Sequence, residues 1–328
     1  MNFKKITGIF VVLVTLWAGL NSCSTDVDLY ADYKDITIVY GLLDAGQDTN
    51  FIKITKAFLG PGNALEIAKD PDSSNYAEKL NVILQGRKNG NDLTPVVLDT
   101  LTIHNKLAGD SIFYFPSQLL YYTDASLDAE ATYTLKIAPE SKAIEAKTDL
   151  IASFGVVRPV NMINFASTLA TQVEWNSARG GKRYEVQLVF NYKELRPGNP
   201  DTIYKQMDWN LGTRHAQNLN GGEAMSVSYM GSDFYNRLGQ QLDDALNVKR
   251  WAGKVVLTIS AGGDELSTFI DVNAPSNSIV QEIPQYTNIT NGYGIFSARS
   301  KAEKTYKLSV LSETKLVEDY NWGFRFER

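Results

Sequence analysis

The sequence lacks most of the cysteine and histidine chemistry on which secreted and catalytic proteins rely. Its 328 residues include one cysteine, Cys23, and two histidines. A lone cysteine excludes a disulfide within the chain, so the fold must be held together by its apolar core. An apolar fraction of 44% is typical of globular proteins, and the length suffices for one large or two medium domains.

Catalytic and metal-binding motifs are also missing. His104 and His215 lie far apart in the sequence, and zinc sites usually need three or four ligands. No zinc-protease, serine-hydrolase or phosphate-loop motif occurs. The pairs Asp243-Asp244 and Asp264-Glu265 do not form glycosidase couples by themselves, because adjacent side chains point apart. We therefore predict no catalytic residue, no metal site and no cofactor. A hydrolase that assembles acids from distant strands stays open as the alternative.

An excess of positive charge is absent as well. The 32 basic residues are outnumbered by 37 acidic ones, which gives a formal net charge of −5. This balance argues against a nucleic-acid partner and against electrostatic binding to a membrane surface. Beyond residue 20, no apolar run approaches the about 20 residues that a membrane-spanning helix needs.

A short apolar run is present near the amino terminus. Lys4 and Lys5 precede residues 6–20, an uncharged stretch that is too short for a transmembrane helix and has the layout of a secretory signal. The run leads into Leu20-Asn21-Ser22-Cys23, which resembles the lipobox of bacterial lipoproteins. The resemblance implies that the Cys23 thiol is acylated, with palmitate as a typical chain, and that the chain is cut directly before it.

This resemblance divides the amino-terminal segment into two parts. We interpret residues 1–22 as a lipoprotein signal peptide and residues 23–35 as an acidic tether. Cys23 is then the lipidation site and the only anchor to the membrane. An ordinary signal peptide followed by an incidental cysteine is the alternative.

From residue 36 onward, apolar and polar residues mostly alternate. Residues 133–138 (Tyr-Thr-Leu-Lys-Ile-Ala) show the clearest alternation, and residues 36–40 and 51–55 are expected to form a hairpin. Short strands separated by turn signals favour an antiparallel β-sandwich, which we assign to residues 36–152. Residues 60–75, rich in Pro, Gly and Asp, are expected to form a long loop.

A second unit is predicted over residues 153–328. Its first strand carries Trp175, and every second position of the next strand is large and apolar: Tyr184, Val186, Leu188 and Phe190. This pattern resembles fibronectin type III and immunoglobulin-like domains, which implies a second antiparallel β-sandwich. Further strands are expected at residues 254–259, 268–272 and 306–310.

One short amphipathic helix is predicted near residues 232–246. Ser232 suits the N-cap and Asp233 the first turn. Apolar residues recur every four positions and form one stripe: Phe234, Leu238, Leu242 and Leu246. We expect this helix to cover an end or edge of the second sandwich. The predicted fold class is therefore mainly β, with two immunoglobulin/fibronectin-type-III-like sandwich units.

Three stretches resemble a Bacteroidetes lipoprotein family whose domain has no known function. They are residues 38–43 (Ile-Val-Tyr-Gly-Leu-Leu), 51–58 (Phe-Ile-Lys-Ile-Thr-Lys-Ala-Phe) and 286–296 (Tyr-Thr-Asn-Ile-Thr-Asn-Gly-Tyr-Gly-Ile-Phe). In the last stretch, Asn291-Gly292 predicts a tight turn and Gly294 a close approach of two backbones. The resemblance implies an outer-membrane lipoprotein that is often encoded near TonB-dependent receptors. It supplies no catalytic residue.

Aromatic residues, 11% of the chain, are the remaining lead to function. Sugar rings stack on exposed aromatic faces and protein partners bury them, although β-sandwiches also use Tyr and Trp for packing alone. The candidate contacts to a glycan or protein partner are Tyr121, Tyr122, Trp209, Tyr229, Tyr286 and Tyr293, and Tyr204 and Trp322 have similar sequence settings.

Together these features predict a noncatalytic lipoprotein held at the outer membrane by its lipid, on either the periplasmic or the exposed side. Its expected partners are a glycan, or an envelope protein such as a TonB-dependent receptor, in the service of uptake or assembly. A glycan-active hydrolase and a purely structural component of an outer-membrane complex are the alternatives.

Overall fold

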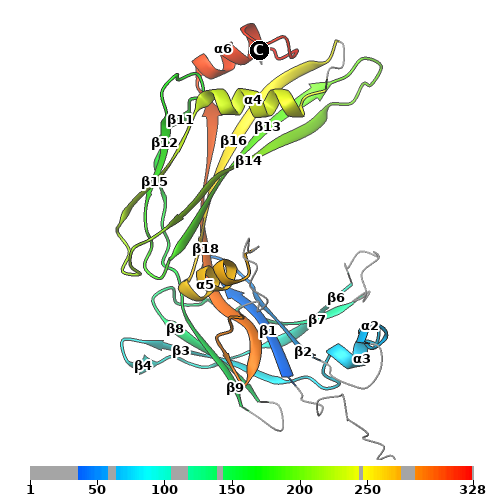
Figure 1. The fold of residues 1–328 in the computed structure, drawn as a ribbon, viewed down its shortest axis with the longest axis vertical. Helices are drawn as coiled ribbons and strands as arrows, with labels where there is room; N and C mark the ends of the chain where they lie inside the picture. Colours follow the sequence, from blue (N-terminus) through cyan, green and yellow to red (C-terminus); the bar gives the residue numbers. More distant parts are fainter. Residues whose placement is uncertain are drawn as a thin grey trace, which may run out of the picture.

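The computed structural model describes residues 36–57, 64–104, 117–138, 143–243, 247–274 and 285–326. Cys23, the expected signal peptide and the expected tether lie outside the described residues. The fold is mainly β and consists of two sandwich-like lobes stacked along the long axis of the molecule (Figure 1). Within the described part of the chain, no helix combines the length and apolarity needed to cross a membrane.

The first lobe is built from two facing sheets. Its strands are β1 (Ile36–Leu43), β2 (Asn50–Ala57), β3 (Asn81–Lys88), β4 (Asn91–Asp92), β5 (Val96–Val97), β6 (Asp99–Ile103), β7 (Gln118–Thr123), β8 (Thr132–Ala138) and β9 (Ile144–Asp149). The order β1-β2-β7-β6 forms one sheet, and β9-β8-β3-β4 the other. The predicted hairpin is confirmed, because β1 and β2 pair antiparallel.

Alternation places one side of each of these strands in the core. Tyr133, Leu135 and Ile137 are buried on β8, as the sequence predicts, and they face buried residues such as Ile52 from the opposite sheet. The Tyr121 hydroxyl accepts a hydrogen bond from the Leu80 backbone N–H at 2.9 Å, which joins the two sheets.

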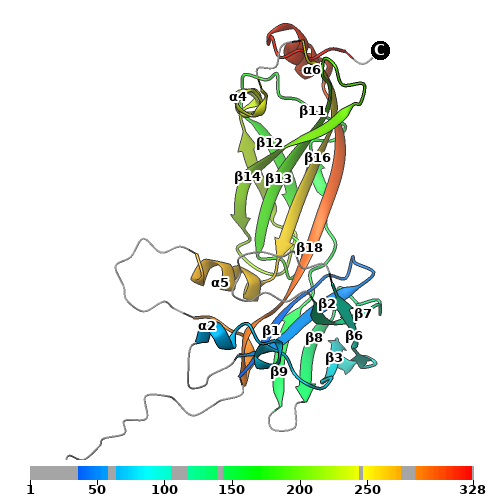
Figure 2. The ribbon, with the colours of Figure 1, turned by 90° about the vertical axis from the view of Figure 1, so that its right-hand side faces the viewer.

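The second lobe contains longer strands. They are β10 (Val156–Arg158), β11 (Met162–Ile163), β12 (Thr171–Asn176), β13 (Arg183–Leu195), β14 (Ile203–His215), β15 (Ala224–Tyr229) and β16 (Lys249–Gly262). The sheet β10-β12-β15 faces the sheet β14-β13-β16, and Trp175 packs against Tyr184 between them with ring centroids 5.9 Å apart. The helices α4 (Gly231–Gln241) and α6 (Val310–Glu318) lie at the far end of this lobe (Figure 2).

One strand belongs to both lobes. Strand β18 (Gly292–Leu308) pairs parallel with β1 through residues 292–298 and antiparallel with β16 through residues 299–306. The short strand β17 (Ile289–Thr290) pairs with β9. Strands β17 and β18, which follow residue 153 in the sequence, therefore complete the first lobe. Figure 1 shows β18 running from one lobe to the other.

The turn before β18 has the predicted geometry. Asn291 has a φ of 58°, in the left-handed region that short polar residues tolerate. Gly294 has a φ of 108°, and a Cβ atom there would lie 2.0 Å from the Val39 carbonyl oxygen. Glycine at this position therefore allows β18 to approach β1.

The predicted strand at residues 268–272 is wrong, because this segment is part of the helix α5 (Asp264–Val272). Asp264 and Glu265 lie in its first turn, where carboxylates favour the helix dipole. A five-residue apolar pattern is compatible with both the period of a strand and the period of a helix. The two carboxylates in the first turn favour the helix. Figure 1 places α5 where the lobes meet.

Three further expectations are corrected. The segment expected as a long loop contains two short helices, α2 (Ala64–Ile67) and α3 (Pro71–Ser74). Strand β18 ends at Leu308 instead of continuing to residue 310, because Ser309 caps α6 by accepting a hydrogen bond from the Ser312 N–H. A helix is present where one is predicted, but α4 starts at Gly231, Ser232 makes no cap, and the helix ends at Gln241, short of the expected residue 246, because Leu242 is extended. The first residue of α4 has room only for glycine, because a Cβ at residue 231 would lie 1.9 Å from the Phe165 carbonyl oxygen.

Candidate functional site: an aromatic and cationic groove

Three of the aromatic residues predicted as contacts are core residues. Tyr121, Trp209 and Tyr229 are 1%, 5% and 4% exposed, so the expectation that they are exposed is wrong. Trp209 and Tyr229 pack edge to face with ring centroids 5.6 Å apart between the sheets of the second lobe. Each lies on the inward side of its strand, where a large ring contributes more to packing than to binding.

The other three retain some exposure but lie on separate elements. Tyr122 on β7 packs against Phe51 with centroids 6.2 Å apart. Tyr286 precedes β17 and is partly buried. Tyr293 on β18 is 48% exposed. The structure does not bring these three together, and their roles as contacts stay predictions.

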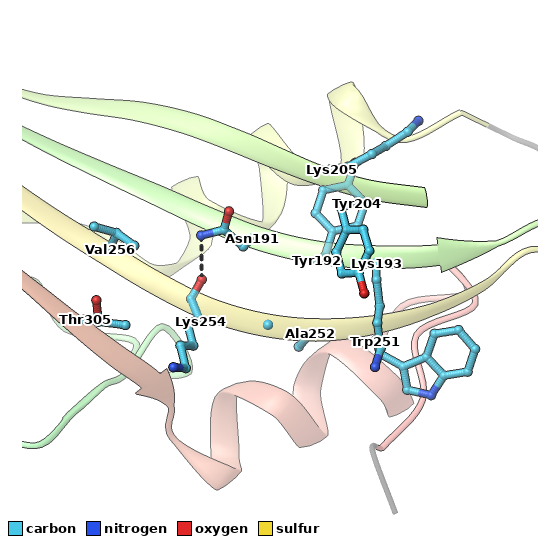
Figure 3. Close-up of a pocket in the computed structure, with 11 residues that line it drawn as sticks. Asn191, Tyr192, Lys193, Tyr204, Lys205, Trp251, Ala252, Lys254, Val256 and Thr305 are labelled. Atoms are coloured by element: carbon cyan, nitrogen blue, oxygen red, sulfur yellow. Dashed lines mark hydrogen bonds between the residues drawn. The ribbon is translucent and has the colours of Figure 1, made fainter. Parts of the chain in front are cut away.

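A groove of about 380 Å³ lies on the outer face of β13, β14 and β16 (Figure 3). Its lining comes from these three strands and from one residue of β18: Asn191, Tyr192, Lys193, Tyr204, Lys205, Trp251, Ala252, Gly253, Lys254, Val256 and Thr305. The groove is open to solvent along the sheet. Three lysines and two partly or fully exposed aromatic rings line it, and none of its described lining residues is a carboxylate.

Strand register places two rings on either side of a lysine. Lys193 on β13 is paired with Tyr204 on β14 and with Trp251 on β16. Tyr192 and Glu194, its neighbours in sequence, are buried, so Lys193 points to the outer face. Tyr204 is 81% exposed. The Lys193 Nζ lies 5.7 Å from the centroid of the Trp251 ring, within cation–π range. We call these three residues the groove row.

A β-bulge shapes the neighbouring part of the groove. The register between β13 and β16 shifts between Phe190 and Tyr192, opposite Gly253 and Lys254. The Asn191 side-chain amide donates a hydrogen bond to the Lys254 carbonyl at 3.2 Å (Figure 3). A Cβ at residue 253 would lie 2.7 Å from the Asn191 oxygen, so glycine permits this contact. Bulges redirect side chains from a regular sheet, and this one presents Lys254 beside the groove row.

A buried ion-pair cluster supports the groove from beneath. Glu194 accepts contacts from Arg196 at 2.7 Å, Lys205 at 3.1 Å and Arg250 at 3.2 Å. Asp243 lies 2.5 Å from Arg196 and 2.7 Å from Arg250. Burial raises the pKa of Glu194, but the hydrogen bonds from its cationic neighbours outweigh burial and hold that pKa below its ordinary value. The cluster fixes Arg250 next to Trp251 and draws the Lys205 ammonium towards the interior.

Acids that could serve catalysis are dispersed. Glu265 on α5 is partly buried, and its carboxylate accepts hydrogen bonds from the hydroxyls of Thr148 and Ser297 at 3.1 and 2.9 Å. Burial raises the pKa of Glu265. This contact joins three elements where the lobes meet, away from the groove. Across the described ranges, no group of three or more His, Cys, Asp or Glu side chains is placed to hold a metal ion.

The comparisons with known proteins add no family. No protein-family description matches the chain, and no curated protein does. The Bacteroidetes lipoprotein resemblance therefore stays a prediction based on the residues that carry it.

Sequence reasoning singled out Tyr204 but missed Trp251 and the lysines. Residues 249–254 (Lys-Arg-Trp-Ala-Gly-Lys) contain a tryptophan between basic residues, which is a weak signal by itself. Only the pairing of β13 with both β14 and β16 brings Trp251 and Tyr204 to the same face.

Proposed function

We propose that this protein is a noncatalytic, lipid-anchored envelope protein that binds a glycan in the groove on β13, β14 and β16. The observation that carries the proposal is the groove row, in which two aromatic rings flank Lys193 on an open sheet face. Exposed rings on a rigid sheet give sugars apolar faces to stack on, at little cost in side-chain entropy. Trp251 lies on β16, which is paired on both sides, and Tyr204 lies on the edge strand β14, which is paired with β13 along twelve residue pairs, so the sheet preorganises both rings.

The composition of the groove favours binding over hydrolysis. Glycoside hydrolases use two carboxyl groups about 5–10 Å apart, whereas the described part of the chain contributes no acidic residue to the lining of this groove. Glu194 lies beneath it, but its carboxylate is committed to three cations. A glycan hydrolase stays the alternative function, and it requires acids outside the groove.

The location is proposed from the amino-terminal sequence. The stretch that ends in Cys23 supports lipidation, and the family resemblance supports the outer membrane. In this setting the protein serves an uptake or assembly system, with a TonB-dependent receptor as the proposed protein partner.

Affinity electrophoresis of the purified, detergent-solubilised protein against a panel of polysaccharides tests the binding function. We expect retardation by at least one glycan, and Trp251→Ala and Tyr204→Ala should each weaken binding about tenfold, which corresponds to about 1.4 kcal/mol. Tyr40→Ala is the matched control, because Tyr40 is an exposed ring on the other lobe and is not a candidate contact. Equal losses in all three variants, or no retardation at all, would contradict the groove as the site. Release of new reducing ends would favour the hydrolase.

A further inference from the structure

We propose that residues 321–325, here called the strap, position Trp251 for glycan binding, and that Phe324 is the positioning residue within the strap. This inference rests on the proposed function and adds to its site a residue that does not line the groove. It starts from the pairing of β16. Strand β18 pairs with β16 only as far as Val255, which is partnered by Tyr306. Trp251 comes earlier in β16 and lies beyond the end of this pairing.

The strap takes the place of β18 beside the start of β16. The Arg250 backbone N–H donates a hydrogen bond to the Gly323 carbonyl at 2.8 Å, and the Arg325 N–H donates one to the Arg250 carbonyl at 2.9 Å. Arg250 and Phe324 thereby form a parallel bridge. Hydrogen-bonded and non-hydrogen-bonded positions alternate along an antiparallel ladder. Arg250, which bonds to the strap, is accordingly followed by Trp251, which is paired with β13.

A glycine lets the strap come this close to β16. Gly323 has a φ of 76°, in the left-handed region, and a Cβ atom there would lie 2.1 Å from the Val248 carbonyl oxygen. The Arg250 side chain adds a further contact, because its Nη1 donates a hydrogen bond to the Trp322 carbonyl at 2.7 Å. Main-chain and side-chain bonds therefore hold the strap against the residues that lead into Trp251.

Phe324 also connects the strap to β13. Its side chain is 4% exposed, and its ring packs against the buried ring of Tyr192 with centroids 6.0 Å apart. Tyr192 directly precedes Lys193, as Arg250 directly precedes Trp251. Phe324 thus contacts, from beneath the groove, the buried neighbours of two of the three residues in the groove row.

The position of Trp251 explains why such support affects binding. Trp251 lies two residues before Gly253, where the bulge interrupts the ladder between β13 and β16. A strand segment beside a bulge opens locally more easily when it is paired on one side alone. An aromatic ring that is fixed before the ligand arrives binds with less loss of conformational freedom. Removing the Phe324 ring should therefore weaken stacking on Trp251, although every residue that lines the groove is unchanged.

A double-mutant cycle measured by calorimetry on the full-length protein tests this role. The probes are pullulan, laminarin, xylan and galactan, and the cycle uses the member that binds the wild type most tightly. We expect Phe324→Ala to weaken binding about three- to tenfold through lost preorganisation. Phe324→Leu, which refills most of the space, should bind within about twofold of the wild type.

The cycle separates positioning from a general loss of structure. In a Trp251→Ala background, Phe324→Ala should change the affinity by less than about twofold, because its effect acts through the Trp251 ring. In a Tyr204→Ala background, the full effect of Phe324→Ala should persist. Phe296→Ala is the matched control, because Phe296 is a fully buried ring in the first lobe. It should lower the Tm and leave the affinity unchanged.

Hydrogen exchange of the Arg250 amide gives a second readout that needs no glycan. This amide should exchange faster in Phe324→Ala than in the wild type, and at the wild-type rate in Phe296→Ala. If Phe324→Ala does not fold, the smaller truncation Phe324→Val takes its place in the cycle, with an expected loss of affinity of about threefold.

The outcomes distinguish the positioning role from the proposed function. Unchanged affinity in Phe324→Ala, or an equal loss with and without the Trp251 ring, would overturn the positioning role and leave glycan binding intact. An unchanged exchange rate at Arg250 would also overturn it. A wild-type protein that binds no member of the panel would overturn both.

Discussion

Replacing Glu194 with glutamine tests whether the buried ion-pair cluster stabilises the sheet that carries the groove. The Glu194 side chain is 1% exposed and faces three cations. Glutamine preserves the shape and one acceptor oxygen but removes the charge. The Arg250 side chain, 3% exposed, then has Asp243 as its only carboxylate among the described residues.

The expected loss of stability depends on whether each of the three cations can reach water or another partner. Removing one partner of a buried ion pair usually costs about 3–5 kcal/mol, because the other charge stays desolvated. Here Arg196 and Lys205, whose side chains are 31% and 36% exposed, can turn into water. Arg250 keeps Asp243 at 2.7 Å and the Trp322 carbonyl at 2.7 Å. We therefore expect the lower end of the range, about 3 kcal/mol, and a fall in Tm of about 6 °C.

Urea unfolding and scanning calorimetry at pH 7 measure this loss. Lys205→Gln is the control for a partly exposed partner and should cost less than about 1 kcal/mol. The double variant Glu194→Met/Arg250→Met removes the central pair and should recover most of the stability, since apolar replacement of a whole buried pair is often neutral. A loss below about 1 kcal/mol in Glu194→Gln would refute the reasoning.

The same variant has a defined pH dependence. Despite the opposing effect of burial, the cationic partners hold the pKa of Glu194 below its ordinary value of 4.5 in the folded protein. The stabilisation is therefore fully present above the unfolded-state pKa and is lost as pH falls through the folded-state pKa. The stability difference between wild type and Glu194→Gln should shrink in acid. A difference that grows below pH 4 would reverse the sign of this assignment.

Three other perturbations have clear expected outcomes. Gly294→Ala forces a Cβ to within 2.0 Å of the Val39 oxygen at positive φ and should cost more than about 4 kcal/mol in urea unfolding, whereas Gly155→Ala, with open space around it, should change stability by about 0.5 kcal/mol or less. Burial raises the pKa of Glu265, so the folded state holds a proton above pH 4.5 that the unfolded state releases. Glu265→Gln should therefore have a larger free energy of unfolding than wild type at neutral pH. Equal free energies of unfolding across a pH titration would contradict this. Cys23→Ala should yield a soluble protein or an uncleaved precursor on fractionation, and full retention in the membrane would exclude acylation as the anchor.

The alternation of apolar and polar residues along the sequence predicted much of the core. Tyr184, Val186 and Leu188 are separated by the polar residues Glu185 and Gln187. All three are buried, as a strand with one inward face requires. Adjacent aromatics were harder to assign. Tyr121 and Tyr122 are neighbours, so a strand can bury only one of them, and the composition of the pair does not indicate which one.

The groove depends on pairing that no local pattern contains. Lys193 is paired with Trp251 close to a β-bulge, and strands β14 and β15 and helix α4 separate the two residues in the sequence. One residue more or less at that bulge would turn Trp251 to the opposite face. Local sequence reports which side chains are large or charged, whereas register decides which of them share a surface.

The position of the groove relative to the proposed anchor sets what it can reach. The expected tether of residues 23–35 enters β1 in the first lobe, whereas the groove lies in the second. Thirteen residues span at most about 45 Å when fully extended, which is the largest distance that the proposed anchor could lie from β1. Strand β18 pairs with β1 and then with β16 without interruption, so a continuous strand joins the first lobe to the lobe that carries the groove. Under the proposed function, a glycan on Trp251 would therefore bind to the lobe that does not carry the proposed anchor. This arrangement suits capture of a polymer that extends beyond the membrane surface better than contact with the lipid headgroups.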